Sequence, residues 1–485
     1  MEPSHDEFDA VVVGAGPNGL AAAVRLAQEG ARVVVLEAAD TIGGGTRTAE
    51  LTLPGFRHDF CSGCHPMGEL SPFFRSLPLA EHGLQWEYPP ASVAHPLDDR
   101  PAAVLWRSLD RTAEELGVDG AAWRRLLGPL LRDGETLLGD TLGPLSWPRA
   151  PLAFARFGMR AAWPATWLAR ALFREPSARA LFAGNAAHSI LPLSHPLTSA
   201  FGVIFALTGH LTDWPVARGG SVAIADALAG VLRSLGGEVR TGVRVSSLAD
   251  LPAARVCLFD TDPAQLSAIA GAALPSGYRR RLARFRYGPG VFKMDFALDG
   301  PIPWRDERCL DASTVHVGGT LEEITASERA MWRGDHAEKP FLIVVQQSLF
   351  DDSRAPAGRH TGYAYCHVPA GSTVDMAPRI EAQIERFAPG FRDRVLARST
   401  TSAGELAAYN PNCVGGAISG GVADATQLFT RPVARLDPYA TPNPRLFLCS
   451  SSTPPGGGVH GMCGYHAAAS ALRRLDAAQP APFNP

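Results

Sequence analysis

The stretch Asp9–Glu37, DAVVVGAGPNGLAAAVRLAQEGARVVVLE, decides the fold of this chain. Phe8–Val13 is a continuous apolar run of β type, Pro17–Glu29 carries Ala and Leu at helical spacing, and Arg32–Leu36 is a second β-type run. A strand, a helix and a strand in this order form a βαβ unit, whose two strands pair in parallel. The segment therefore predicts an α/β domain built on a parallel sheet.

The glycine motif Gly14-Ala15-Gly16-Pro17-Asn18-Gly19 joins the first run to the helix. Its first glycine allows a tight turn, its second lets the backbone approach a pyrophosphate, and its third permits close helix packing. Glu37 ends the second run and can accept hydrogen bonds from ribose hydroxyls. The alternative is a merely structural turn, but strand, glycines, helix and acid in register predict a Rossmann-like dinucleotide site. The contacts predicted here are Gly14, Gly16, Pro17, Asn18, Gly19, Glu37 and Ala38.

Length, composition and charge are those of a large globular protein. At 485 residues the chain exceeds what one hydrophobic core commonly supports, so two or three core-bearing units are expected. Hydrophobic residues make up 46% and charged residues 19%, which excludes wholesale disorder. The 45 Lys plus Arg against 48 Asp plus Glu give a net charge of -3, so no nucleic-acid partner is predicted.

Targeting and cysteine patterns predict a cytoplasmic protein. Met1–Asp9 lacks the basic and apolar regions of a signal peptide, and no apolar stretch is long enough to span a membrane. The eight cysteines are scattered, as is typical of free thiols in a reducing compartment. Cys61 and Cys64 form a CxxC that does not open a helix, so two packed thiols are expected. No metal site is predicted.

Three further segments resemble one group of flavoproteins. Asp40–Thr48 (DTIGGGTRT) resembles the second motif of two-dinucleotide-binding-domain flavoproteins, a glycine pair that lines the FAD phosphates. Arg445–Met462 (RLFLCSSSTPPGGGVHGM) aligns without a gap on the C-terminal flavin motif of bacterial phytoene desaturases. Arg218–Ser221 and Glu238–Leu248 resemble the family's Gly-Gly segment and adenine-binding strand. The chain is identified as a member of the phytoene desaturase and flavin amine oxidase superfamily.

The resemblance implies a fold, a cofactor and further contacts. The implied fold class is α/β, with a Rossmann-like FAD-binding domain, an interleaved substrate domain carrying a mixed β-sheet, and a helical insertion. The FAD-binding domain is expected over 1–95, 215–288 and 405–478, the helical insertion or lid over 96–214, the substrate sheet over 289–404, and a flexible tail over 479–485. The further FAD contacts that the resemblance implies are Gly44, Gly45, Thr46, Arg47, Val245, Ser452, Gly458, Gly461 and Met462.

Five ionisable residues are candidates for catalysis or proton transfer. Lys293 is one of only two lysines, and a lysine on the comparable strand of amine oxidases holds a water against flavin N5. His460 stands where carotenoid desaturases usually have proline, which implies an ionisable group near the flavin. Asp59 matches a family acidic position, and His65, like His58, is a candidate for proton transfer. The alternative for each is a structural side chain.

The predicted function is that of an FAD-dependent oxidoreductase that desaturates a lipophilic substrate by hydride transfer to flavin N5. Only one dinucleotide motif has its strand and helix, so reoxidation by O2 or a quinone is expected instead of a dedicated NADPH domain. One alternative is an amine or amino-acid oxidase that produces hydrogen peroxide. Another is a flavin-binding structural protein without turnover.

Arginines and aromatic residues alternate in Arg149–Arg179. A basic amphipathic helix with this composition can lie on an anionic membrane surface, so peripheral membrane contact is one hypothesis. A lid helix with a solvated arginine face is the other. The residues concerned are Arg156, Arg160, Arg170 and Arg174, with Phe154, Phe157, Trp163, Trp167 and Phe173.

Overall fold

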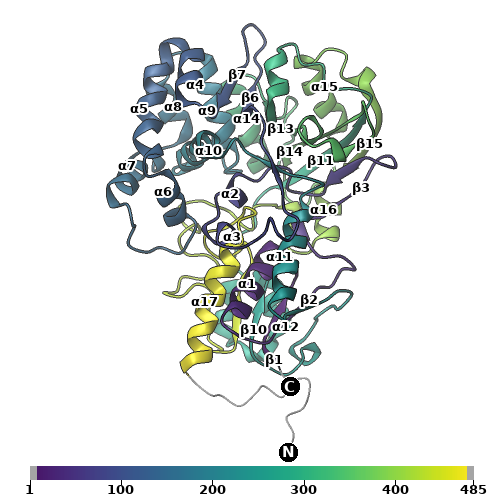
Figure 1. Cartoon of the computed structure of the whole chain (residues 1–485). Coiled ribbons are helices and arrows are strands. Elements are labelled where there is room, and N and C mark those ends of the chain that lie inside the picture. The colour runs from purple at the N-terminus through teal and green to yellow at the C-terminus, as the bar shows by residue number, and fades with distance from the viewer. Residues whose placement is uncertain (1–7, 478–485) are drawn as a thin grey trace, which may run out of the picture.

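The structure, a computed structural model, describes residues 8–477 and has two bodies (Figure 1). The lower body contains a parallel sheet, and the upper body contains a mixed sheet beside a group of helices. The expected tail at 479–485 lies outside the described residues. No helix among the described residues is long and apolar enough to cross a membrane.

The lower body is the expected Rossmann-like unit. Its five strands pair in parallel in the order β16-β10-β1-β2-β9. They are β1 (Phe8–Val13), β2 (Val33–Leu36), β9 (Glu238–Arg240), β10 (Ala254–Phe259) and β16 (Leu446–Leu448). One face carries α1 (Pro17–Gln28), α11 (Val222–Ser234) and α17 (Met462–Ala477), and the other carries α12 (Pro263–Ala270) and α13 (Ser276–Leu282).

Burial on both faces explains the continuous apolar run of the first strand. Ala10 and Val12 pack in the core under α1, while Val11 and Val13 pack in the core under α12. A strand with two covered faces needs no polar alternation. The predicted α/β fold class is confirmed.

The two helices α1 and α17 cross at very short range. A Cβ at Gly464, in the first turn of α17, would lie 1.8 Å from the carbonyl oxygen of Asn18 in α1. Glycine is therefore required there, because any side chain would push the two backbones apart. This crossing holds the C-terminal segment against the N-terminal glycine motif.

The upper body contains a seven-stranded mixed sheet in the order β15-β11-β14-β13-β12-β6-β7. Its strands are β6 (Ala91–His95), β7 (Ala103–Trp106), β11 (Gly290–Leu298), β12 (Ala312–Val317), β13 (Leu342–Val345), β14 (His360–Val368) and β15 (Val395–Thr401). The sheet thus extends beyond the expected 289–404 range, since β6 and β7 come from segments assigned to 1–95 and 96–214. The local sequence could not reveal this, because β6 pairs with β12, which is far away in the chain.

Helices between residues 109 and 212 flank this sheet on one side (Figure 1). They are α4 (Leu109–Glu115), α5 (Gly120–Leu131), α6 (Gly134–Thr141), α7 (Pro151–Ala161), α8 (Ala165–Leu172), α9 (Pro176–Ala187) and α10 (Thr198–Thr212). The single basic helix expected over Arg149–Arg179 is wrong. Pro164 and Pro176 stand where one helix would need a backbone N–H, so the segment divides among α7, α8 and α9.

Shorter elements complete the chain. They are α2 (Pro66–Glu69), α3 (Pro72–Arg75), α14 (Leu321–Ala330), α15 (Ala377–Phe387), α16 (Ala403–Tyr409) and the strand pairs β3 (Thr48–Glu50) with β4 (Arg57–Asp59) and β5 (Trp86–Glu87) with β8 (Val216–Ala217).

The α1–α17 crossing gives a stability prediction. Gly464→Ala should lower the free energy of unfolding by about 3 kcal/mol, the upper part of the range for overpacking a core. Gly158→Ala is the matched control, because a Cβ at that helical glycine would have no atom within 4 Å. The control should gain roughly 0.5 to 1 kcal/mol from helix propensity. Equal urea midpoints for the two variants would contradict the close crossing.

Candidate functional site

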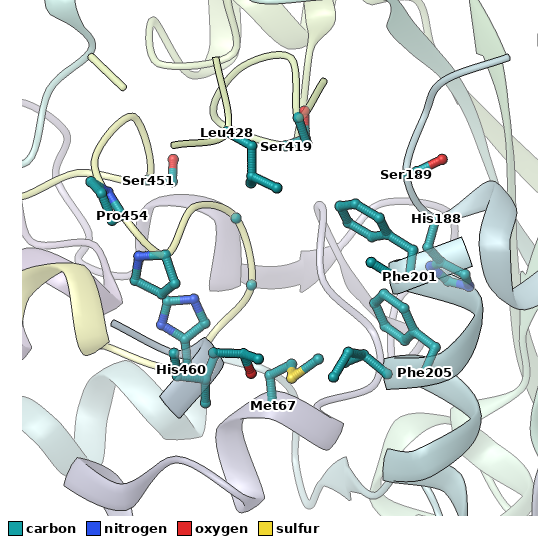
Figure 2. A pocket seen from close by; sticks show the side chains of 18 of the residues that line it. Met67, His188, Ser189, Phe201, Phe205, Ser419, Leu428, Ser451, Pro454 and His460 are labelled. Atoms are coloured by element: carbon teal, nitrogen blue, oxygen red, sulfur yellow. The ribbon is translucent and has the colours of Figure 1, made fainter. Parts of the chain in front are cut away.

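A cavity of about 980 Å³ lies where the lower and upper bodies meet. Its lining comes from the glycine motif, the segment Gly45–Gly68, helices α7 and α10, strand β14 and the C-terminal loop. Figure 2 shows His460, Pro454 and Ser451 on one side of the open space, with Phe201, Phe205 and His188 on the other. The cavity thus has one end near the glycine motif and another among aromatic residues of the upper body.

The two glycine segments meet at the first end of the cavity. The N–H of Gly43 donates to the carbonyl of Ala15 over 2.9 Å, and a Cβ at Gly44 would lie 3.2 Å from the Cα of Gly16. Gly14 has φ +103°, a conformation that L side chains rarely adopt. The second glycine segment therefore lies directly on the first, as a shared phosphate cradle requires.

Glu37 occupies the position expected of a ribose acceptor. Its carboxylate accepts from the N–H groups of Ala15 and Ala39 at 2.8 and 2.9 Å, and from Arg47 at 3.1 Å. A carboxylate has about four acceptor sites, so one of them is left for a hydroxyl. Arg47 also donates to the carbonyl of Thr41, which ties the second glycine segment to Glu37.

The buried polar atoms at this end that have no hydrogen-bond partner within residues 8–477 include Oδ1 of Asn18 and Nε2 of His460, and both residues line the cavity. Met462 donates its N–H to Nδ1 of His460 over 3.0 Å, which assigns the ring proton to Nε2. Burial lowers the pKa of His460 to about 4, so the ring is neutral at pH 7. An acceptor, a donor and two glycine loops together fit a dinucleotide such as FAD.

Asp260 contacts the glycine motif, although the sequence did not single it out. It follows β10, the neighbour of β1, and its Oδ2 accepts the N–H of Gly19 over 2.9 Å. A Cβ at Gly16 would lie 2.7 Å from the same oxygen. Burial and the nearby Glu37 raise the pKa of Asp260 to about 8, against the opposing effect of the Gly19 N–H. Its place at the carboxyl end of a strand beside β1 is the signal that could have identified it.

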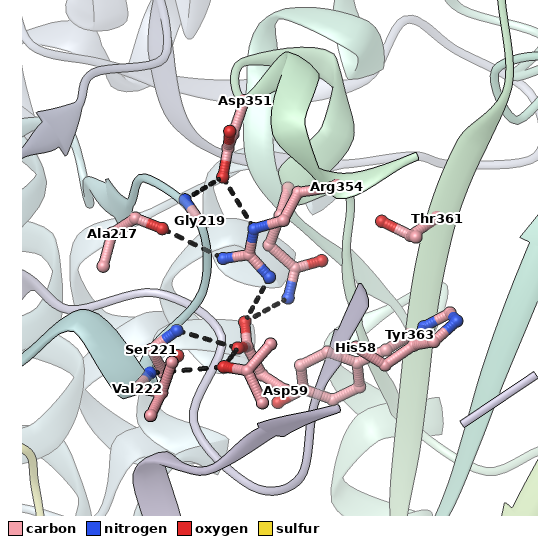
Figure 3. A network of polar contacts seen from close by, with 12 residues as sticks. His58, Asp59, Ala217, Gly219, Ser221, Val222, Asp351, Arg354, Thr361 and Tyr363 are labelled. Carbon is pink, nitrogen blue, oxygen red and sulfur yellow. Dashed lines mark hydrogen bonds and ion pairs between the residues drawn. The ribbon is translucent and has the colours of Figure 1, made fainter. Parts of the chain in front are cut away.

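Asp59 lies in a buried polar network away from the cavity lining (Figure 3). Its Oδ1 accepts from Thr48 and from the N–H of Ser221 at 2.6 and 2.8 Å, and its Oδ2 accepts from Arg354 at 2.9 Å. Arg354 also donates to Asp351 over 2.7 Å. Although burial raises the pKa of Asp59, the Arg354 guanidinium and these hydrogen bonds hold it below its ordinary value. Asp59 is thus the counter-ion of a buried guanidinium, and its catalytic role stays a prediction.

Lys293 is also absent from the cavity lining. Its ammonium forms a buried ion pair with Asp295 and lies 4.7 Å from the ring centre of Tyr363. Burial raises the pKa of Asp295, and the lysine opposes that effect. His58 is on the other side of the same carboxylate, with Nδ1 3.6 Å from Asp295 Oδ1. The lysine is therefore first of all the cation that a buried carboxylate needs.

His65 does line the cavity, with both ring nitrogens occupied. Its Nε2 bonds to Ser221 Oγ at 2.9 Å and its Nδ1 to Ser62 Oγ at 3.2 Å. Burial lowers the pKa of His65 to about 4, so a neutral ring links the two serines. Of the candidates for proton transfer, only His460 combines a place in the cavity wall with an unpartnered ring nitrogen.

The predicted FAD contacts divide into two groups. Those that line the cavity are Pro17, Asn18, Gly45, Thr46 and Gly458. Those that are not part of the lining are Gly14, Gly16, Gly19, Glu37, Ala38, Gly44, Arg47, Val245, Ser452, Gly461 and Met462. Ser451 lines the cavity in place of its predicted neighbour Ser452.

The chain is similar to several known proteins. Residues 12–77 match the NAD(P)-binding Rossmann-like domain. The chain is 26% identical to pyridine nucleotide-disulfide oxidoreductase domain-containing protein 2 of Mus musculus, over 97% of this chain and 94% of that protein. It is 28% identical to phytoene dehydrogenase of Streptomyces griseus, over 80% of this chain and 77% of that one. A solved structure of a putrescine oxidase variant superimposes with a TM-score of 0.61 at 17% identity, covering 96% of this chain and 99% of that one.

The raised pKa of Asp260 predicts a pH dependence of stability. Between about pH 4 and pH 8 the folded protein holds a proton on Asp260 that the unfolded chain releases, so this group makes folding less favourable as pH rises. Asp260→Asn keeps an acceptor for Gly19 and removes the titration. Its urea midpoint should therefore fall less than that of the wild type between pH 5 and pH 8.

The exposed residue Asp335 provides the control, Asp335→Asn, which should follow the wild-type pH profile. If Asp260→Asn and wild type lose stability in parallel over this range, Asp260 ionises normally and the account of its environment is wrong.

Proposed function

We propose that this chain, an oxidoreductase related to the phytoene dehydrogenases and with the fold of a flavin amine oxidase, uses FAD to dehydrogenate a lipophilic small molecule. The observation that carries the proposal is that one cavity joins the paired glycine segments and the unpartnered groups of Asn18 and His460 to a largely apolar chamber. A lipophilic substrate suits walls formed by residues such as Phe201, Phe205 and Trp214.

FAD, when bound, supplies a two-electron acceptor for a C–H bond of the substrate. Gly16 and Gly44 would let the backbone reach its phosphates, and Glu37 would accept a ribose hydroxyl. The neutral His460 would offer its Nε2–H to the cofactor end of the cavity. The apolar chamber would hold the substrate and exclude water, so that positioning contributes much of the rate.

The proposed electron acceptor is O2 or a quinone, because the chain carries one dinucleotide motif with its strand and helix. The amine or amino-acid oxidase remains the second candidate, and Lys293 is the feature that favours it. The non-catalytic flavoprotein is the third, and reduced protein that reacts with no acceptor would support it.

Reoxidation of the photoreduced protein tests this proposal and the role of Lys293 together. We expect fast reoxidation by O2 or a quinone and slow bleaching of the oxidised protein by NADPH. Lys293→Met alone leaves Asp295 without its cation, so the double variant Lys293→Met/Asp295→Asn is the matched comparison. If the amine assists oxygen, both variants should retain FAD but react with air at least tenfold more slowly, or about 1.4 kcal/mol of barrier.

A double variant that reacts with air at the wild-type rate would make Lys293 only the counter-ion of Asp295. Rapid and saturable reduction by NADPH would contradict the proposed acceptor.

We also propose that the segment 145–167 contacts a membrane surface. Six apolar side chains of this segment are exposed, namely Leu145, Trp147, Leu152, Met159, Trp163 and Trp167. Arg149, Arg156 and Arg170, in or next to the segment, are exposed as well. Leu145 also lines the cavity, so the same surface borders the chamber for a lipophilic substrate. Exposed tryptophans with nearby arginines suit the boundary of an anionic bilayer.

Sedimentation with vesicles tests this contact. The protein should bind vesicles that contain half anionic phospholipid more strongly than neutral ones, and Trp147→Ser/Trp167→Ser should reduce binding several-fold. Leu235→Ser/Leu396→Ser removes two exposed apolar side chains elsewhere and should not change it. Equal binding by the two double variants would exclude this surface.

A further inference from the structure

Strand β14 presents three ring side chains on one face, at every second residue. Tyr363 and Tyr365 stack with ring centres 5.9 Å apart, and Tyr365 meets the ring of His367 at 5.8 Å. Tyr363 donates its hydroxyl to the carbonyl of Cys61 over 3.1 Å and does not line the cavity. Tyr365 and His367 do line it, so β14 turns two polar groups toward an otherwise apolar chamber.

His367 is held by a fully buried carboxylate. Both oxygens of Glu328, on α14, lie within hydrogen-bond distance of His367 Nδ1, at 2.8 and 3.0 Å. Glu328 is 0% exposed and His367 is 6% exposed. Nδ1 therefore carries the proton of this bond, because a carboxylate oxygen only accepts. Nε2 has no partner within residues 8–477, and it can donate to a ligand when the ring holds a second proton, whose charge the Glu328 carboxylate would offset.

Tyr365 adds a second donor beside it. Its hydroxyl makes no hydrogen bond with the part of the chain that the structure describes, and burial keeps it protonated by raising its pKa. The phenol and the imidazole are neighbours on one strand face, with ring centres 5.8 Å apart, and both line the chamber. Two adjacent donors of this kind select an oxygen acceptor.

The surroundings offer little to a cationic ligand. His188 lies close to His367, and its Nε2 bonds to His316 Nε2 at 3.0 Å. Burial, together with His367, lowers the pKa of His188 to about 3, so its ring is neutral. Asp140 is the one acidic residue in the described lining, and it already pairs with Arg149 at 2.9 Å. Glu328 is likewise engaged by His367, so no carboxylate in the described part of this wall is available to an ammonium group.

We propose that Tyr365 and His367 bind an oxygen acceptor, a carbonyl or a carboxylate, carried by an otherwise lipophilic substrate. The inference rests on the proposed oxidoreductase function and narrows its substrate class. It favours an oxygenated lipophile over both a pure hydrocarbon and an amine. Glu328 is a positioning residue, because it orients the imidazole without touching the substrate.

Calorimetric titration of the FAD-loaded protein with three ligands of one chain length tests the proposal. The probes are 2-dodecanone, dodecanoate and dodecylamine, each below its aggregation concentration. The ketone, the carboxylate or both should bind at least tenfold more tightly than the amine. Comparing the affinities for the ketone and for the carboxylate shows which of the two groups, carbonyl or carboxylate, the site prefers.

Variants on the same strand locate the effect. Tyr365→Phe should weaken binding of the preferred ligand at least tenfold and leave the amine within about twofold, as expected for loss of one hydrogen bond. Tyr363→Phe is the matched control, since it removes a hydroxyl from the same strand face outside the cavity lining, and it should not change binding. His367→Gln should act like Tyr365→Phe.

Tyr365→Phe keeps the proposal testable if His367→Gln fails to fold, because it leaves the Glu328–His367 pair intact. Binding of the amine as tight as that of the oxygenated ligands would overturn the inference, and so would equal effects of the two tyrosine variants. Both results leave the proposed FAD chemistry standing. A wild-type protein that holds no FAD would instead contradict the proposed function itself.

Discussion

Three backbone segments of the chain come into contact around Asn18, and each close contact is possible only because a glycine stands there. A Cβ at Gly19 would lie 2.0 Å from the carbonyl of Gly14, one at Gly44 would lie 3.2 Å from Gly16 Cα, and one at Gly464 would lie 1.8 Å from the carbonyl of Asn18. The N-terminal turn, the second glycine segment and the C-terminal helix can therefore meet at one point. The cofactor end of the cavity exists because they do.

A second constraint joins this point to the upper body. Arg354 follows strand β13 and bonds to Asp59, to Asp351 and to the carbonyl of Ala217, all of them buried (Figure 3). Its partner Asp59 also accepts the N–H of Ser221, at the start of α11. Each charge is compensated only in this arrangement, and removing one partner would leave the other buried without compensation. The network holds the Gly219–Ser221 turn against the mixed sheet of the upper body.

Sequence revealed the parts of the molecule that local chemistry determines. The βαβ unit, the glycine segments and Glu37 were predictable, because turn geometry and two-sided burial act over a few residues. The sheet positions of β6 and β7 were not, since they depend on pairing with β12 far along the chain. The same holds for single side chains. The carboxylate of Asp260 is held by the N–H of Gly19, which is far away in the sequence. The ring of His367 is oriented by Glu328, which belongs to another element.

The surroundings of Lys293 were also not predictable from the sequence. Its strand was predicted, but its ion pair with Asp295 depends on the burial of both side chains, which a strand pattern does not reveal. The resemblance to amine oxidases suggested that Lys293 takes part in the reaction. The structure shows that buried Asp295 also needs the lysine as its counter-ion. For His460 the structure strengthens the case for a role in the site, because its unpartnered Nε2 lies in the cavity wall.

Equilibrium titration of flavin-depleted protein with FAD tests the central claim most directly. The meeting of the two glycine segments predicts saturable binding of one FAD per chain, accompanied by a change in the flavin spectrum. Gly16→Val would place a side chain against Asp260 at the cradle and should abolish this binding. A wild-type chain that takes up no FAD, or a Gly16→Val variant that binds it as tightly as wild type, would contradict the account.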